Sequence, residues 1–401
     1  KPNFYAKGQD YKNKKNDLSK NIYKEISAIK SVGGKFITSN TPMHSSTKII
    51  NNETNFLSDN LKNYIKDINK ENLKTKYLDF LKNKLKKKIL VIGEPIIDVY
   101  NYVQIQGKSS KNNILSSKHL STSEFGGGSI LVANILKEYF DKIDFVVFQN
   151  TQNKNYIKKF LNDKKISLKK IYDKKCKFII KKRFIDKYSN NRLYQINYND
   201  DFASINKAGS KICDYLKKNN KLYDYIIIFD FGHNFINKEV VKEIKKLSKK
   251  TFINCQSNSS NFGFNLVNKY SKANTISMDE QEFRLSVQDK STTIINLIKS
   301  NKNFIKKFKN FIITMGKYGS YHISKKSNLY SPTVYNTFKD TTGSGDVFFS
   351  IYIALKISNK FSDREICLIC HIAAGLHANK VGNDKIFDLK SLYKSLELVL
   401  K

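Results

Sequence analysis

Short apolar runs that alternate with amphipathic helical segments constrain the fold of this chain more than any other feature. Ile89–Ile92 is one such run and stops at Gly93. Similar runs follow at 143–148, 225–229, 251–254 and 311–315. Helical patterns lie between them, at 130–140, 204–218, 238–249 and 292–308. This alternation predicts an α/β fold around a mostly parallel sheet, in which ligands bind beyond the carboxyl ends of the strands.

The length and the N-terminus set further limits. With 401 residues, the chain has room for two domains, or for one large domain with an appendage. It contains no run of 18 or more apolar residues, so we predict no membrane span. Lys1-Pro2-Asn3-Phe4 is not followed by the apolar stretch of a signal peptide, and there is no initiator Met. We therefore expect a cytoplasmic protein whose sequence here begins inside a longer chain.

The formal net charge of +37 has two interpretations. Clustered basic residues attract phosphates and are typical of nucleic-acid binders. Here, however, Lys is spread along the whole chain and far outnumbers Arg, and no nucleic-acid-binding motif accompanies it. We favour a compositional origin and expect no specific nucleic-acid partner, although a positive field would attract ATP and sugar phosphates.

The cysteines do not form a disulfide or metal framework. They are odd in number and irregularly spaced, at positions 176, 213, 255, 367 and 370. Reduced thiols are the simplest interpretation. Cys367-Leu-Ile-Cys370-His371 matches the haem c attachment string, but it lies in an apolar helical stretch, where two cysteines three residues apart are usually core residues. We predict neither haem nor zinc.

Two segments differ from the α/β pattern. Residues 51–87 contain no Gly or Pro and show helical spacing of apolar residues, which predicts one or two linker helices. Phe178–Asp186 and Arg192–Tyr198 are β-rich runs around the turn-like triplet Ser189-Asn190-Asn191. They predict a hairpin, at about 176–200, that is either a lid over a site or a surface decoration.

The glycine-rich segment Asp340-Thr-Thr-Gly-Ser-Gly-Asp346 carries the strongest chemical signal, because an apolar helix follows it at 347–355. Glycines at a helix start let backbone amides approach a phosphate, and the helix dipole adds positive potential. Asp346 then has two interpretations. It either caps the helix or stabilises the helix dipole, or it accepts a proton from a hydroxyl group that attacks a phosphoryl group.

This segment, with the Val347-Phe348-Phe349 that follows it, resembles the C-terminal signature of the PfkB, or ribokinase-like, carbohydrate kinases. The resemblance implies a three-layer α/β sandwich with a mostly parallel sheet and a small β lid, and an enzyme that uses ATP and Mg²⁺. It makes Asp346 the catalytic base. It assigns the anion hole to four residues of the turn: Thr342, Gly343, Ser344 and Gly345.

Other segments resemble the same family, over about residues 88–385. Gly93-Glu-Pro-Ile-Ile-Asp98-Val-Tyr100 resembles the opening motif of its heptose 7-phosphate kinases, in which the Asp holds sugar hydroxyls. Phe125-Gly126-Gly127-Gly128 and the following Asn134 resemble the N-terminal glycine signature, which contacts substrate. Ile130 stands where the family commonly has a sugar-binding Asn, so the identity of the sugar stays open.

Two further segments resemble the nucleotide side of the family's site. The Thr314-Met-Gly316-Lys-Tyr-Gly319 segment resembles a loop that contacts ATP, which implicates Thr314, Gly316 and Gly319. Ser277-Met-Asp279-Glu-Gln-Glu282 resembles an Asn-x-x-Glu motif, with Asp279 in place of the Asn. The resemblance implies that Glu282 holds Mg²⁺ through water. The alternative for Glu282 is a solvated helix residue.

The first fifty residues resemble the tail of the nucleotidyltransferases that activate sugar phosphates. The resemblance is carried by Lys7-Gly8-Gln-Asp10-Tyr11 and by Ser45-Ser46-Thr47, which would bind nucleotide phosphate at a helix start. We expect three parts: 1–50 as the C-terminal part of a nucleotidyltransferase-like domain, 51–87 as a helical linker, and 88–401 as the kinase domain.

The function predicted from these segments is phosphorylation of a sugar or sugar-phosphate hydroxyl, with a heptose-phosphate-like substrate favoured, in a truncated bifunctional kinase/nucleotidyltransferase. A non-catalytic relative that binds a sugar or nucleotide for regulation is the alternative, and a homodimer is left open.

Overall fold

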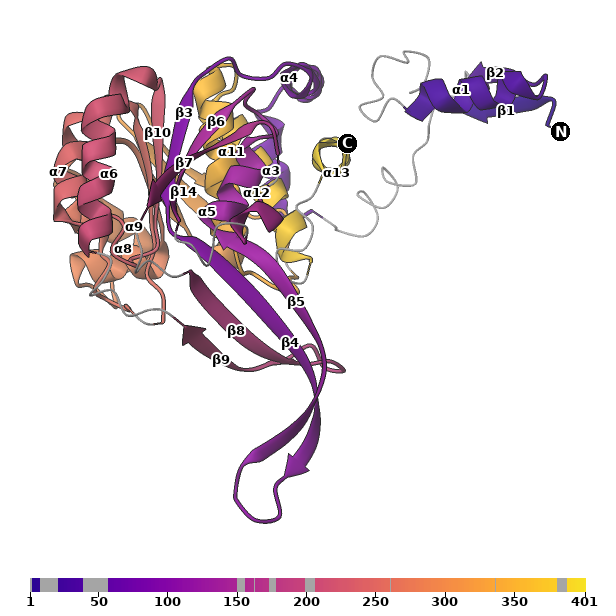
Figure 1. The fold of residues 1–401 in the computed structure, drawn as a ribbon. Helices are drawn as coiled ribbons and strands as arrows, with labels where there is room; N and C mark the ends of the chain where they lie inside the picture. Colours follow the sequence, from indigo (N-terminus) through magenta and orange to yellow (C-terminus); the bar gives the residue numbers. More distant parts are fainter. Residues whose placement is uncertain are drawn as a thin grey trace. The chain divides into compact units, whose positions relative to one another are not determined.

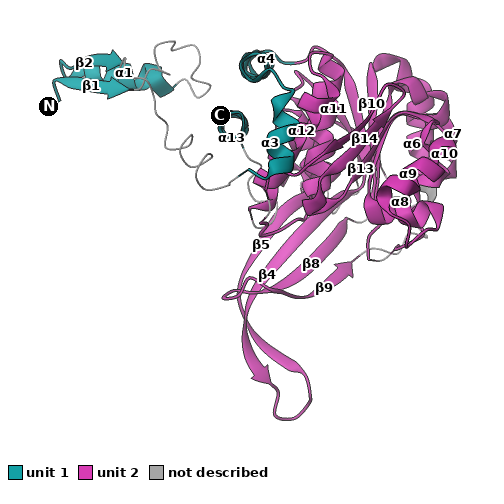
Figure 2. Ribbon diagram, turned by 180° about the vertical axis from the view of Figure 1, so that it is seen from behind, with its two compact units in different colours: residues 1–84, 387–401 teal, residues 85–386 magenta. Residues whose placement is uncertain are grey.

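The computed structural model describes residues 2–7, 21–38, 57–149, 156–161, 163–172, 178–198, 206–259, 261–335, 337–380 and 388–401. The chain divides into two compact units (Figure 2). Unit 1 combines residues 1–84 with 387–401, and unit 2 is residues 85–386.

A nine-stranded sheet forms the centre of unit 2, in the order β15-β14-β13-β12-β11-β10-β3-β6-β7. The strands from β7 to β13 pair in parallel, whereas β14 and β15 are antiparallel. This confirms the predicted α/β fold with a mostly parallel sheet. The strands are β3 (Ile89–Gly93), β6 (Ile143–Gln149), β7 (Ile166–Tyr172), β10 (Tyr225–Asp230), β11 (Thr251–Cys255), β12 (Ala273–Asp279), β13 (Phe308–Thr314), β14 (Ser320–Ser324) and β15 (Asn328–Ser331).

Helices cover both faces of this sheet (Figure 1). Alternate residues of the buried strands point to opposite faces. Ile226 and Ile228 of β10 belong to a core shared with the helices of one face, whereas Phe229 packs against Phe349 of α11 on the other, with 5.7 Å between the tilted rings' centroids. The first face carries α6 (Asn206–Asn219), α7 (Lys238–Lys246), α8 (Glu280–Val287), α9 (Ile294–Ser300) and α10 (Lys302–Ile305); the second carries α5 (Ser129–Leu136), α11 (Ser344–Ser358) and α12 (Asp363–Ala378).

A second sheet projects from the large one, in the order β5-β4-β8-β9 (Figure 1). Its strands are β4 (Pro95–Lys108), β5 (Leu115–Gly128), β8 (Ile179–Asp186) and β9 (Arg192–Tyr198). The antiparallel pairing of β8 with β9 confirms the hairpin expected from the sequence. This four-stranded sheet is called the lid below.

The lid is larger than the hairpin that the sequence predicted, because it also contains two segments that were interpreted as motifs and not as strands. Ligand-binding segments of such a sheet are expected beyond the carboxyl ends of its strands, and the segments that contain Asp98 and Gly126–Gly128 were interpreted as ligand-binding. They lie instead on the paired strands β4 and β5. Beyond Val103 the residues of β4 are mostly exposed, so the apolar signal of a strand stops there although the strand continues to Lys108.

Unit 1 contains a parallel pair, β1 (Phe4–Lys7) and β2 (Lys35–Thr38), with α1 (Asn21–Ser31) between them in sequence. It also contains α3 (Asp59–Lys66), α4 (Lys70–Lys82) and α13 (Leu389–Val399). The helices α3 and α4 fall within 51–87, where linker helices were expected. The helix α13 groups with unit 1, whereas the sequence analysis placed it in the kinase domain. Ser45, Ser46 and Thr47 lie outside the described residues.

Two further expectations concern the cysteines and the absence of a membrane span. The described cysteines, Cys213, Cys255, Cys367 and Cys370, are free and buried. Within the described ranges, we find no helix with the length and apolarity needed to cross a bilayer.

Candidate active site

The carboxyl ends of neighbouring parallel strands place polar groups along one edge of the large sheet. Gln256 follows β11, Asp279 ends β12 and Thr314 ends β13. A cavity of about 540 Å³ opens at this edge, against the start of α11. Among the residues that line it are Gln256, Asp279, Glu282, Thr314, Gly316, Gly319, Gly343, Ser344, Gly345, Asp346 and His371. The nucleotide-side and glycine-turn residues are thus brought together around one cavity.

Asp346 lies in the first turn of α11 with only 5% of its surface exposed. The residue at the N-cap position is Gly343, and no side-chain capping bond is made there. Oδ1 of Asp346 instead accepts a hydrogen bond of 2.6 Å from Nε2 of Gln256. Asp346 is therefore not the N-cap of α11, although it lies in the first turn, where a carboxylate also stabilises the helix dipole.

Burial sets the acidity of Asp346. It raises the pKa of Asp346 to about 7, and the negative charge of Asp98 acts in the same direction, while the hydrogen bond from Gln256 and the charge of Lys181 lower it. A carboxyl group with this pKa is divided between its two protonation states near neutral pH. This is the acidity that suits a general base.

The turn before α11 presents backbone to the cavity. Gly343 has φ of 79°, a conformation that glycine adopts without strain. At Gly345, an added Cβ would meet nothing within 4 Å, so the backbone there is open to a ligand. The first amides of a helix have no intrahelical acceptors, and the helix dipole favours an anion at this end. One expectation needs correction: the Ser344 amide is not free, because it donates to the Thr341 carbonyl at 3.1 Å.

Thr342 is also placed differently from expectation. Its hydroxyl accepts a hydrogen bond of 2.6 Å from Arg192, and its carbonyl oxygen lies 3.0 Å from Nε2 of His377. Its amide donates to Asp340 at 2.9 Å. Thr342 therefore holds the turn in shape, and the neighbouring Thr341 lines the cavity.

Glu282 and Asp279 form a reciprocal cap at the start of α8. Oε2 of Glu282 accepts from the Asp279 amide at 2.7 Å, and Oε1 accepts from the Ser257 amide at 2.6 Å. Glu282 is 8% exposed, so the solvated interpretation is wrong. Burial, with the negative charge of Asp279, raises the pKa of Glu282 to about 8.

These two carboxyl groups fit a hydrated Mg²⁺ ion. Oxygen ligands are the ones that Mg²⁺ prefers, and it usually keeps several waters. The repulsion that raises the pKa of Glu282 would be relieved by a cation at the cavity wall. Among the described residues, no group of three or more His, Cys, Asp and Glu side chains is arranged to hold a metal ion.

The nucleotide-side loop depends on glycine geometry. Gly319 has φ of 92°, and a Cβ there would lie 2.2 Å from the Ser331 carbonyl oxygen. Gly316 also has positive φ. His371 is buried beside this loop, with Nε2 2.9 Å from Oγ of Ser320. Burial lowers the pKa of His371 to about 4, so this cavity wall is neutral near pH 7.

Comparisons with known proteins identify the family. The sequence model described as "pfkB family carbohydrate kinase" matches residues 86–384. This chain belongs to the pfkB family of carbohydrate kinases.

Two curated proteins are similar to parts of it. The bifunctional protein HldE of Aliarcobacter butzleri is 25% identical over 322 residues, which cover 77% of this chain and 66% of that protein. The small ribosomal subunit protein uS3m of Vanderwaltozyma polyspora is 29% identical over 125 residues, which cover 31% of this chain and 56% of that protein. The chain thus spans less than two thirds of the length of either relative.

Solved structures agree on the fold. Phosphofructokinase-2 from Escherichia coli, in complex with potassium, superposes with a TM-score of 0.61 at 12% identity, over 79% of this chain and 100% of that one. Ribokinase of Arabidopsis thaliana, complexed with ribose and ATP, superposes with a TM-score of 0.58 at 14% identity, over 78% of this chain and 99% of that one. The fold of this pfkB-family chain is therefore ribokinase-like.

The lid of this pfkB-family chain reaches the glycine-rich turn through side chains that the sequence analysis did not select. The hydroxyl of Tyr100 on β4 donates to Asp340 at 2.9 Å, and Arg192 on β9 forms an ion pair with the same carboxylate. Asp98 is buried in an ion pair with Arg183 of β8. Asp98 and Tyr100 are two residues apart and share a face of β4. If β4 had been recognised as a strand, the sequence would have indicated that these two side chains lie on the same face of it.

The family resemblance implies that Gly126, Gly127 and Asn134 contact substrate, and in this structure they lie where the lid joins the large sheet. A Cβ at Gly126 would lie 2.4 Å from Cγ2 of the buried Ile130. Gly127 pairs with Ile96 in the ladder between β4 and β5. Nδ2 of Asn134 donates to the Phe160 carbonyl at 2.9 Å. These contacts fix the base of the lid, and none of the three residues lines the cavity described above.

Proposed function

We propose that this chain transfers the γ-phosphoryl group of ATP to a hydroxyl group of a sugar or sugar phosphate. The observation that carries the proposal is the buried Asp346 carboxyl group beside an open glycine turn. Asp346 does not cap its helix, its pKa is about 7, and it lies on the wall of a cavity large enough for a nucleotide's phosphates.

In this mechanism, Asp346 accepts the proton of the attacking hydroxyl group as the new O–P bond forms. Backbone groups at Gly343 and Gly345, with the dipole of α11, offset the negative charge on the phosphoryl oxygens. Asp98 orients the sugar from the lid. When Mg²⁺ is bound, it neutralises phosphate charge, and Glu282 and Asp279 would hold its water ligands.

A heptose-phosphate-like substrate is supported by the similarity to the bifunctional protein HldE and by the sequence around Asp98. The same similarity supports a bifunctional protein, in which the nucleotidyltransferase-like part indicated by residues 1–50 accompanies this kinase. Ile130 is fully buried, so a sugar contact at that position is not available here. Selectivity for the sugar must then come from the lid and from Asp98.

The experiment is an ATP-consumption assay across a panel of sugars and sugar phosphates, with wild-type protein and Asp346→Asn. The variant should lose about a hundredfold to ten-thousandfold in turnover, because Asn cannot accept the proton. Asp214→Asn, on the exposed surface of α6, is the matched control and should keep wild-type turnover. A folded Asp346→Asn protein with normal turnover would remove Asp346 from the mechanism. A wild-type protein that binds sugar and nucleotide without turnover would support the regulatory alternative.

A further inference from the structure

Gln256 contacts the proposed base directly and occupies the first position after β11. Its Nε2 donates to Oδ1 of Asp346 at 2.6 Å and also to Oδ1 of Asn254 at 2.5 Å. An ionised carboxylate only accepts hydrogen bonds, so the nitrogen of the Gln256 amide must face it. Both N–H groups of this amide are therefore used, and the side chain has one favourable orientation.

The direction of the Asn254 amide reinforces that orientation. Nδ2 of Asn254 donates to the Ser277 carbonyl at 3.5 Å on the neighbouring strand β12. This bond turns Oδ1 of Asn254 toward Gln256. The chain of hydrogen bonds thus starts on the backbone of β12 and ends with a donor at Asp346.

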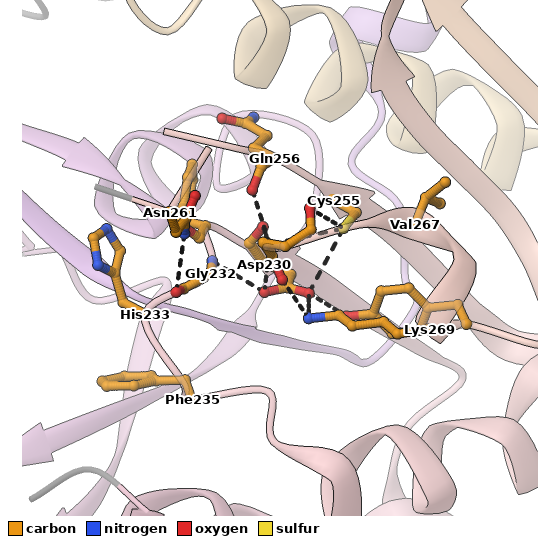
Figure 3. A network of polar contacts seen from close by, with 12 residues as sticks. Asp230, Gly232, His233, Phe235, Cys255, Gln256, Asn261, Val267 and Lys269 are labelled. Atoms are coloured by element: carbon orange, nitrogen blue, oxygen red, sulfur yellow. Dashed lines mark hydrogen bonds and ion pairs between the residues drawn. The ribbon is translucent and has the colours of Figure 1, made fainter. Parts of the chain in front are cut away.

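The backbone of Gln256 is held from the other side by a buried polar network centred on Asp230 (Figure 3). The Gln256 amide donates to the Asp230 carbonyl at 2.9 Å, and the Gln256 carbonyl accepts from Nδ2 of Asn265 at 2.8 Å. The Asp230 carboxylate forms an ion pair with Lys269 and accepts a 2.6 Å hydrogen bond from Tyr270. Buried ion pairs contribute little net stability compared with apolar packing. Here the pair fixes the ends of β10 and β11, and with them the position of Gln256.

We propose that Gln256 is a positioning residue for the base. It holds Oδ1 of Asp346, leaves Oδ2 for the acceptor hydroxyl, and favours the ionised form of the carboxyl group. This inference rests on the proposed function of Asp346. The charged groups that also act on the ionisation of Asp346 are Asp98 of β4, which disfavours it, and Lys181 of β8, which favours it. Glu282 of α8 interacts electrostatically with Asp346, but its pKa of about 8 leaves it mostly uncharged where Asp346 ionises. The Gln256 amide and the charge of Lys181 together offset the effect of Asp98.

The test compares wild type, Gln256→Ala and Gln256→Glu by the pH dependence of kcat and by KM for ATP. Gln106→Ala, at an exposed position on the distal part of β4, is the matched control. Loss of a hydrogen bond to a charged group should move the acidic limb of the Gln256→Ala profile upward by about one pH unit. At pH 6.5 its kcat should then fall about tenfold and recover above pH 8.5, with KM nearly unchanged. Gln256→Glu should move the limb further, because a second carboxyl group faces Asp346.

A second measurement does not depend on turnover. The difference in melting temperature between a protein and its Asp346→Asn variant should grow with pH and level off near the pKa of Asp346. In the Gln256→Ala background the levelling should occur about one pH unit higher.

The outcomes of these measurements distinguish the role proposed for Gln256 from the proposed kinase function. An unchanged pH profile and an unchanged levelling point in folded Gln256→Ala would overturn the role of Gln256, while the kinase activity of the wild type stands. Wild-type protein without turnover on any substrate would overturn the proposed function, and the melting measurement would still decide whether Gln256 sets the ionisation of Asp346.

Discussion

At the scale of single residues, the pKa of Asp346 leads to a prediction about pH and rate. Burial raises this pKa from an ordinary 3.8 to about 7. Only the ionised carboxylate can accept the hydroxyl proton, so turnover should rise about tenfold per pH unit below pH 7 and level off above it. A kcat profile between pH 5 and 9 at saturating ATP checks this. A rate that is flat from pH 5 upward would mean that another group limits the reaction.

The same pKa predicts how Asp346→Asn changes stability. The folded state holds the proton more tightly than the unfolded state, so the Asp346 carboxyl favours folding below about pH 4, and that contribution is lost as pH rises to about 7. Above pH 7, wild type keeps a buried negative charge that Asn lacks. Asp346→Asn should therefore unfold at a higher temperature than wild type at pH 8, with the difference fading toward pH 4. A carboxylate whose main role is to stabilise the dipole of α11 would give the reverse sign, with the variant less stable at pH 8.

Glu282 gives a second residue-scale prediction. Glu282→Gln should keep the cap of α8, because Gln also serves in a capping box. It removes the carboxyl group that a bound Mg²⁺ ion would ionise next to Asp279, so the Mg²⁺ concentration for half-maximal activity should rise about tenfold. Glu280→Gln, on the same helix and paired with Arg284, is the matched control. Identical Mg²⁺ curves for wild type and Glu282→Gln would remove Glu282 from the metal site.

The sequence could predict those site residues whose role depends on local backbone geometry. Asp346, Gly343 and Gly345 lie in one contiguous motif at the start of α11, and the motif already places them. Gln256 and Arg192 could not be found in this way. Their function comes from hydrogen bonds across 90 and 148 positions of sequence, which only the folded sheet brings together.

At the scale of elements, the lid is tied to the glycine-rich turn through Tyr100 and Arg192, which meet at Asp340. Binding of substrate between the lid and the turn should hold these contacts more of the time. We therefore expect segment 178–198, which contains several Lys and Arg residues, to resist trypsin better when sugar and nucleotide are present. Limited proteolysis with and without ligands measures this. In Arg192→Ala the protection should be weaker, and equal cleavage in all cases would make the hairpin a structural decoration.

Strands were predictable from the sequence where their side chains are apolar and buried on both faces of the sheet. The strands β3 and β10 are fully or almost fully buried, and Ile89–Ile92 and Ile226–Phe229 within them are continuous apolar runs. The strand β12 was missed because it buries Thr275 and Ser277, whose polarity resembles a loop. The strand β5 and the part of β4 beyond Val103 were missed because much of their length is exposed. For all three strands, the extended conformation depends on pairing with a strand that is distant in sequence. The local sequence alone does not indicate it.

At the scale of the whole molecule, the high positive charge is a property of the surface. Lysines line two separate depressions of unit 2, one of which includes Lys86, Lys87 and Lys142, and the other Lys249 and Lys250. Neither depression contains the residues of the candidate site. A charge spread in this way contributes a long-range field that attracts anions to the entire molecule.

That field predicts how salt changes the kinetics. ATP is highly charged, and the Debye length falls from about 10 Å at 0.1 M salt to about 3 Å at 1 M. KM for ATP should therefore rise several-fold between about 0.05 and 0.5 M KCl, whereas kcat should change less than about twofold, because Asp346 and the glycine turn act at short range in a buried site. An uncharged sugar acceptor provides the internal control, since its KM should stay constant over the same range. If ATP turnover ignored salt while binding of a random RNA fell steeply with it, the charge would serve a nucleic-acid partner and not the kinase site.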